Sequence, residues 1–146
     1  MNYKKDLPGT WYIIGSTFSM WTKGKKYNPS ITYSVFKNNP LTFIDQVQYE
    51  KNYKVKSIVG YDKLTSDQFT WRGKGLLKVF TSKWEVLYLD SELLIIQFTS
   101  TLVTPSGMDI LVGDKQSISY YKKRIIDFPN SFNINTVKMD NMHWLF

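Results

Sequence analysis

Alternation of apolar and polar residues along most of the chain is the feature that most restricts its fold. Between Tyr53 and Tyr61, apolar or aromatic residues occur at positions 53, 55, 59 and 61, and lysines occupy 54 and 56. Residues 30–37 and 43–49 alternate in a similar way, and Asp45 interrupts the second of these runs. Further runs cover 69–73, 76–82, 84–89, 93–101 and 108–112. A period of two is typical of β-strands with one buried face, so the chain is predicted to be all-β.

Turn signals between these runs predict short connections. They include Asn38–Pro40, Lys51–Asn52 and Thr65–Asp67. Short loops join antiparallel neighbours, because a parallel crossover needs about a dozen residues or more. Eight or nine strands joined in this way form a sandwich or an up-and-down barrel. Their even spacing favours a single up-and-down antiparallel β-barrel over about residues 9–113, since closure removes exposed edges.

The C-terminal part of the chain differs in its periodicity. With 146 residues the chain is predicted to be one domain, 1–146. Residues 117–126 place Ile118, Tyr121 and Ile125 on one helical face, which predicts a short C-terminal helix capped by Ser117. A final barrel strand is the alternative. Residues 127–146 are predicted to form a tail that covers the domain or is mobile.

Composition excludes several function classes. The chain has no cysteine and one histidine, so thiolate and multi-histidine metal sites are excluded, and neither a metal nor another cofactor is predicted. It has no nucleophile motif, and the possible acid–base pair of Asp45 and Glu50 resembles surface groups. We therefore do not expect an enzyme. No signal peptide or apolar membrane span is visible, so the compartment stays open, with the cytoplasm favoured.

Net charge gives a separate indication about partners. The formal charge is +7, which favours anionic partners, although scattered lysines could simply keep a barrel soluble. Aromatic residues make up 16% of the chain and suit a core, a ligand cavity or a base-stacking surface. A barrel that binds single-stranded nucleic acid is therefore one alternative, although alternation of rings with lysines in 53–61 favours interior rings and makes nucleic acid the less favoured partner.

The stretch Gly9-Thr10-Trp11-Tyr12 resembles the Gly-x-Trp signature of the lipocalins, in the calycin superfamily. In that family the tryptophan plugs the closed end of an eight-stranded antiparallel barrel. Glycine permits a sharp turn into the strand, and a large indole fills a narrow base. The resemblance implies this structural role at the barrel base for Gly9 and Trp11.

Other lipocalin motifs are matched only in part, so the sequence resembles a divergent branch of the family. Asp90 stands where the family has an aspartate in a turn between two late strands, and it is expected at the barrel base. The family's arginine that covers the tryptophan is missing near Gly113, and Lys115 or Arg124 is expected to substitute. Residues 18–29 lack helical periodicity, which disfavours the related fatty-acid-binding proteins.

The resemblance also implies a ligand cavity lined by the inward side chains. The binding of a small hydrophobic ligand, such as a fatty acid, another lipid or an aromatic metabolite, is the expected function, and a filled barrel that binds a protein is the third alternative. The inward set predicted from the apolar side of each run is Ile13, Tyr33, Val35, Val47, Tyr49, Val55, Val59, Tyr61, Trp71, Phe80, Val86, Tyr88 and Ile95.

Residues 18–29 are expected at the barrel mouth. This segment, the mouth loop, combines Phe18, Met20 and Trp21 with three lysines. It is interpreted as a lid or as a patch that meets an anionic membrane, or else as a loop whose aromatic rings fold back onto the barrel. Arg72 and Lys74 are expected outside if Trp71 is inside. Oligomeric state is left open.

Overall fold

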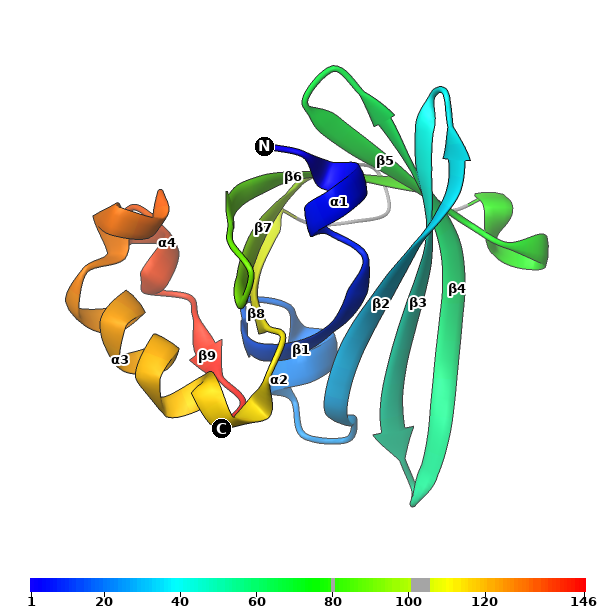
Figure 1. The fold of residues 1–146 in the computed structure, drawn as a ribbon. Coiled ribbons are helices and arrows are strands. Elements are labelled where there is room, and N and C mark those ends of the chain that lie inside the picture. The colour runs from blue at the N-terminus through cyan, green and yellow to red at the C-terminus, as the bar shows by residue number, and fades with distance from the viewer. Residues whose placement is uncertain (80, 101–105) are drawn as a thin grey trace.

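A computed structural model describes residues 1–79, 81–100 and 106–146. Its strands are β1 (Gly9–Ser16), β2 (Tyr27–Asn38), β3 (Leu41–Lys51), β4 (Lys54–Thr65), β5 (Gln68–Gly73), β6 (Thr81–Leu89), β7 (Leu93–Thr99), β8 (Gly107–Val112) and β9 (His143–Trp144). Strands β1 to β8 pair antiparallel in chain order, and pairing of β1 with both β2 and β8 closes the sheet (Figure 1). The predicted up-and-down barrel is confirmed.

Two short helices lie at opposite ends of this barrel (Figure 1). Helix α1 (Tyr3–Asp6) precedes β1, and α2 (Ser19–Thr22) follows it. We call the α1 end the base and the α2 end the mouth. Past the mouth the β3–β4 hairpin projects beyond the neighbouring strands (Figure 1). No helix in the described ranges is both long and apolar enough to cross a membrane.

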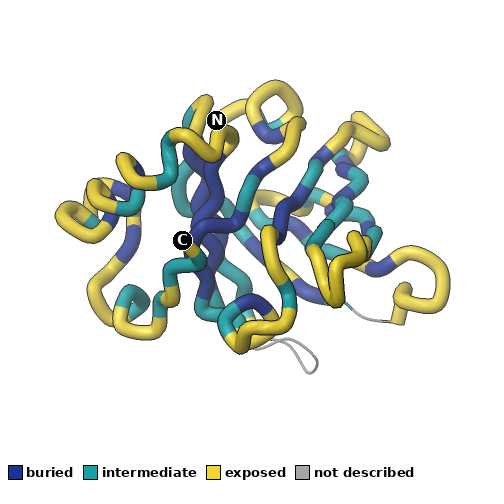
Figure 2. Tube along the Cα trace, turned by 90° about the horizontal axis from the view of Figure 1, so that it is seen from below, coloured by how far each residue is buried: buried dark blue, intermediate teal, exposed yellow. Residues whose placement is uncertain are grey.

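The C-terminal segment covers one outer side of the barrel. Helix α3 (Ile118–Asp127) confirms the predicted helix, and α4 (Thr136–Met139) and the 3-10 turns η2 (Lys115–Ser117) and η3 (Pro129–Phe132) flank it. Ser117 does not cap α3 through its side chain; its hydroxyl donates to the Asp114 carbonyl instead. Tyr121 and Ile125 pack with outward residues of β7 and β8, and Figure 2 shows buried wall residues beside this helical layer.

One predicted strand is a turn in the structure. The apolar run 76–82 does not form a strand of its own, because the 3-10 turn η1 occupies Gly75–Val79 and a single strand, β6, covers Thr81–Leu89. Gly75 has a φ of 64°, a left-handed conformation that suits glycine and turns the chain away from β5. Leu76 and Val79 are exposed there.

The predicted facing of β4 is wrong. In the β3–β4 register Phe43 lies opposite Asp62 and Val47 opposite Ile58, so the even-numbered residues of β4 face the interior. The row predicted to face inward, Val55, Val59 and Tyr61, therefore faces outward. This row is apolar for other reasons: Tyr61 packs on the ring of Phe36 outside the barrel, and Val55 is exposed on the projecting hairpin.

Tyr88 and Ile95 also face outward, contrary to prediction. An irregularity in the β6–β7 pairing between Val86 and Tyr88 moves Tyr88 to the outer face, opposite Ile95. Both belong to the outer cluster beneath α3 and η3, where Tyr88 contacts the ring of Phe132. Strand β7 is apolar on both faces because a helical layer covers its outer face. Alternation therefore could not indicate which of its two faces is interior. Phe80 lies outside the described residues.

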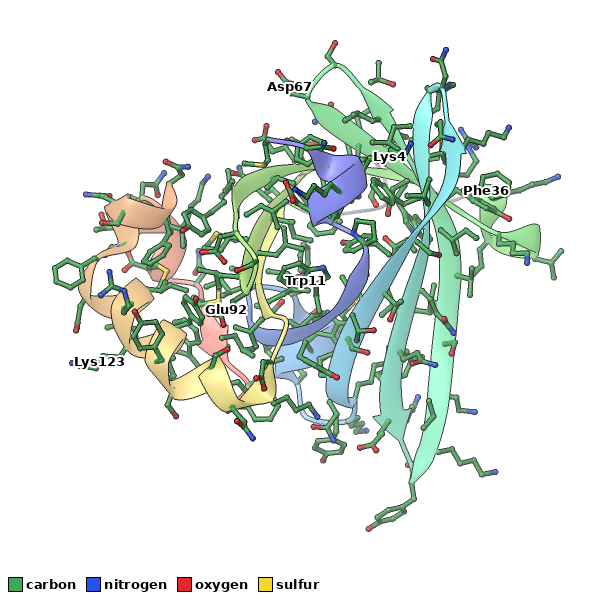
Figure 3. The ribbon with its side chains drawn as sticks, in the orientation of Figure 1. Lys4, Trp11, Phe36, Asp67, Glu92 and Lys123 are labelled. Carbon is green, nitrogen blue, oxygen red and sulfur yellow. The ribbon has the colours of Figure 1, made fainter. Side chains whose placement is uncertain are left out.

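The base of the barrel is closed by Trp11, as the lipocalin resemblance implied. Trp11 is 4% exposed, its Nε1 donates to the Leu7 carbonyl at 2.9 Å, and Figure 3 shows it within the barrel. Gly9 has a φ of 129°, and a Cβ at this position would have open space around it, so backbone conformation rather than room requires glycine. Asp90 accepts hydrogen bonds from the Glu92 and Leu93 amides in the turn at the same end.

The expected substitutes for the missing arginine do not cover Trp11. The Lys115 ammonium lies over the ring of Tyr12, and the Arg124 guanidinium lies near the rings of Tyr120 and Phe128. Helix α1 has the covering role instead, because Leu7 at its C-terminal end is fully buried and belongs to the same core cluster as Trp11.

Candidate functional site

A cavity of about 530 Å³ occupies the mouth half of the barrel. Of the residues predicted to face inward, Ile13, Val47 and Trp71 line it. The whole lining is Ile13, Thr17, Phe18, Ser19, Met20, Trp21, Ile31, Asp45, Val47, Ile58, Trp71, Ser82, Phe98, Ser106 and Asp109. Nine of these fifteen side chains are apolar, and six are polar or charged. The barrel is therefore not filled along its whole length.

Four further predicted residues lie elsewhere. Tyr33 is 2% exposed and packs on the base side of the cavity. Tyr49 and Val86 pack against the interior cluster without lining the cavity. Val35 lies opposite Phe43, so it is on the inner side by register, but it is 38% exposed where β2 leaves the barrel. The structure thus brings together only part of the predicted set.

The mouth loop forms one wall of the cavity. Trp21 is 6% exposed and its ring lies 5.6 Å from that of Tyr49, and the ring of Phe18 meets that of Phe98 edge-on at 5.2 Å. Met20 is more exposed, at 41%. The rings of Phe18 and Trp21 therefore fold back onto the barrel, whereas Tyr27 in the same loop is exposed.

A second, outer groove runs beside the mouth between this loop and the tip of the β3–β4 hairpin. Lys25, Lys26 and Lys51 line it together with Tyr53, which is fully exposed. The exposed ring of Tyr53 contradicts the expectation that the rings in 53–61 face the interior. Arg72 does lie outside, as predicted, and donates to the Lys78 carbonyl at 2.9 Å.

Three buried carboxyl groups belong to the interior of the barrel. Asp45 on β3 is 5% exposed, Asp62 on β4 is fully buried, and Asp109 on β8 is 3% exposed. Asp45 and Asp109 line the cavity, and Asp62 lies one step toward the base, opposite Phe43. Carboxyl groups are seldom buried without a charged partner, which marks these three as unusual.

Asp45 and Asp62 form a carboxyl pair. The two side chains are in hydrogen-bonding contact, and Asp62 Oδ1 also accepts from Trp84 Nε1 at 2.9 Å. If both groups were ionised, Asp45 Oδ1 and Asp62 Oδ2 would each lack a hydrogen-bond donor. One proton shared between the two carboxyl groups supplies that donor. Burial raises the pKa of Asp45 to about 6 and raises the pKa of Asp62 further, since the Asp45 charge adds to the effect of burial. The pair therefore shares one proton near neutral pH and carries one negative charge.

Asp109 is the third buried acid. Its Oδ1 accepts a hydrogen bond from Ser16 Oγ at 2.6 Å, across the β1–β8 pairing. Burial raises the pKa of Asp109 to about 7, and the Ser16 hydroxyl opposes this rise only in part. The carboxyl group is thus poised to change its protonation state near neutral pH.

No built-in cation balances these acids within the described ranges. The one ion pair found there, Lys123 with Asp127, lies on the exposed side of α3. Among the described residues that line the cavity there is no Lys, Arg or His. The described residues also contain no group of three or more potential metal ligands. A basic protein thus encloses an acidic interior.

This acidic site was not predicted from the sequence, although Asp45 left a signal. Residues 43, 45, 47 and 49 form one row of β3, so an aspartate in that row has to be buried or to disrupt the strand. Glu50, considered as its partner, faces outward and accepts from Asn28 Nδ2. Asp62 was missed because the even-numbered residues of β4 were predicted to face outward, whereas they face the interior. Asp109 interrupts the apolar run 108–112 in the same way as Asp45.

Comparisons with known proteins concern the fold. No family model matches the sequence, and no curated protein matches it. Among solved structures, apocrustacyanin C1 is similar with a TM-score of 0.63 and 14% identity, over 94% of this chain and 75% of that one. The siderocalin Ex-FABP is similar with a TM-score of 0.58 and 15% identity, over 84% and 87% of the two chains. The closed eight-stranded barrel with its tryptophan at the base and these similarities together show that the chain has a lipocalin-like fold.

Proposed function

We propose that the protein binds a small ligand with a largely apolar body inside the barrel. The observation that carries this proposal is the cavity of about 530 Å³ at the mouth. Ligand sites commonly measure about 300–1,000 Å³ and combine apolar walls with a few polar groups. The similar siderocalin is described as functioning through dual ligand specificities, which supports a binding role for this barrel as well.

The rings and aliphatic groups of the lining supply the driving force. Trp21, Trp71 and Phe98 lie around the space, and Val47 and Ile58 extend the apolar wall on β3 and β4. A ligand that buries roughly 300 Å² of apolar surface gains about 7 kcal/mol from desolvation, before the entropy cost of association. One or two polar contacts with the lining would add to this gain.

Binding of N-phenyl-1-naphthylamine, a neutral probe that fluoresces in apolar surroundings, tests the proposal. We expect saturable binding to the wild-type protein and a loss of at least tenfold in affinity for Ile58→Trp, because the larger side chain fills the cavity. Val59→Trp is the matched control, since the neighbouring residue faces outward. Absence of saturable binding, or equal weakening by both variants, would refute a ligand site in this cavity.

Contact of the mouth with an anionic membrane stays a prediction. The outer groove at the mouth carries Lys25, Lys26 and Lys51 beside the exposed Tyr53, a combination that suits an anionic lipid surface. Sedimentation with phosphatidylserine vesicles measures this contact. We expect weak, salt-sensitive binding that decreases for Lys25→Glu/Lys26→Glu, and no difference between phosphatidylserine and phosphatidylcholine vesicles would contradict it.

A further inference from the structure

We propose that the ligand is an organic cation, whose apolar body fills the cavity and whose protonated amine or quaternary ammonium group lies against Asp45 and Asp109. This inference rests on the proposed function and names the chemical class of the ligand.

A buried carboxylate without a counter-ion is the first reason. Asp45 is only 5% exposed, lines the cavity, and has no donor in the described part of the chain apart from the carboxyl group of Asp62. The shared proton of that pair satisfies one oxygen of each group but leaves the pair with a negative charge. Removing such a charge from water costs several kcal/mol unless an opposite charge compensates it. A cationic group in the cavity would supply this compensation.

The position of Asp109 is the second reason. Asp109 comes from β8 and Asp45 from β3, two strands separated in the wall by β1 and β2, and yet both carboxyl groups line the same space. The Ser82 hydroxyl is a further oxygen in this lining. These groups can accept hydrogen bonds from an ammonium group.

The aromatic walls distinguish an organic cation from a metal ion. Trp21, Trp71 and Phe98 surround the cavity, and the faces of such rings attract ammonium groups while their area buries the apolar body. A divalent metal ion would instead need several oxygen ligands converging on one point. The described residues contain no such group of three acids.

The same acids oppose a ligand with a carboxylate. A fatty-acid headgroup within this cavity would lie near Asp45 and Asp109 with no cation in the described lining to receive it. Like charges at close range in a poorly solvated site repel one another strongly. The outside of the protein has the opposite character, with a net charge of +7. Recognition of the cation is therefore local, because surface charges are screened over about 8 Å at physiological salt.

Proton release is the expected thermodynamic signature. The groups that face Asp45 are Asp62 on β4 and Tyr33 on β2, with Asp109 on β8 near Tyr33, and none of these is a cation. Because the pKa of Asp109 is about 7 and that of Asp45 about 6, a bound cation displaces protons from these groups near neutral pH. Affinity for a cation should then increase between about pH 5.5 and pH 8, whereas affinity for a neutral ligand should not.

Three probes with the same alkyl chain and different headgroups test the proposal: decylammonium, decanol and decanoate. Each competes with N-phenyl-1-naphthylamine at pH 8 on the wild-type protein, on Asp45→Asn, on Asp109→Asn and on the double variant. Asp67→Asn is the control, because Asp67 lies at the exposed tip of the β4–β5 hairpin (Figure 3) and its loss changes the net charge equally. Circular dichroism and decanol affinity verify that each variant is folded.

We expect decylammonium to bind at least tenfold more tightly than decanol, and decanoate to bind most weakly. Each cavity substitution should reduce the preference for the cation, the double variant should abolish it, and Asp67→Asn should retain it. Equal binding of decylammonium and decanol, stronger binding of decanoate, or a preference that survives in the double variant would overturn the cation assignment while leaving a ligand-binding barrel. Failure of every probe, including N-phenyl-1-naphthylamine, would overturn the proposed function itself.

Discussion

The two halves of the barrel use the same strands in different ways. At the base, Tyr33, Phe43, Phe69 and Trp84 are each at most 2% exposed, and Phe69 stacks on Trp84 with ring centroids 4.4 Å apart. At the mouth, the cavity replaces this packing. Strand β3 supplies Phe43 to the base and Asp45 to the cavity only two residues later, so the change from solid core to binding space occurs within one strand.

Contacts at the border between the two halves explain how buried carboxyl groups are held inside the barrel. Trp84 belongs to the packed base, but its Nε1 donates to Asp62, which in turn contacts Asp45 at the cavity. The packed aromatic layer of the base therefore orients the carboxyl pair from the base side of the cavity. The base stabilises the fold and positions the carboxyl pair, whereas the mouth is less tightly packed and contains the cavity.

The largest expected effect comes from Trp84→Ala in the base. The substitution removes a fully buried indole and the donor to Asp62, so the free energy of unfolding should decrease by about 3–5 kcal/mol. Urea denaturation measures it. Trp71→Ala in the cavity wall should cost clearly less, because its side chain is only half-buried. Equal losses in the two variants would contradict the distinction between base and mouth.

A second prediction concerns the pH dependence of stability in the ligand-free protein. The unfolded Asp109 carboxyl loses its proton near pH 4 and the folded one near pH 7, so this group lowers stability as pH rises through that interval and has no further effect above it. A difference of this size corresponds to roughly 4 kcal/mol. Asp109→Asn removes this loss.

The stability of Asp109→Asn relative to wild type should therefore increase between about pH 4.5 and pH 7.5. Thermal unfolding at a series of pH values measures this difference, and the asparagine Oδ1 can still accept from the Ser16 hydroxyl. Asp67→Asn should show no comparable trend. A constant difference between Asp109→Asn and wild type across this range would argue against a carboxyl group that is poorly solvated in the mouth half.

The smallest of the three effects is expected for Gly9→Ala at the base. Its φ of 129° strains any residue with a Cβ, so we expect a loss of about 1–3 kcal/mol in urea denaturation, although a Cβ would meet nothing within 4 Å. Gly113→Ala, near Trp11 but without a positive φ, is the control and should cost less than about 1 kcal/mol. Ligand affinity in the mouth half should not change in either variant.

Much of the base was predictable from local sequence, whereas the cavity was not. Gly9 and Trp11 lie two residues apart, so a short motif describes their joint role. The acids that mark the mouth come from positions 45, 62 and 109 on three strands, and only strand pairing brings them to one interior. Asp45 and Asp109 had a visible signal, each as a charged residue in an apolar run, whereas Asp62 had none.

Alternation, turn residues and the short N-terminal motif were enough to predict the all-β class, the antiparallel neighbours joined by short turns, the helix near residues 118–127 and the tryptophan at the base. Which face of β4 and β7 is interior follows only from strand pairing and from the packing of α3. The physical reason is that a period of two defines two faces without naming the inner one, and an outer face can also be apolar where α3 covers it, as at Ile95. The acidic interior depends on that choice, because Asp62 is buried only when the even row of β4 faces inward.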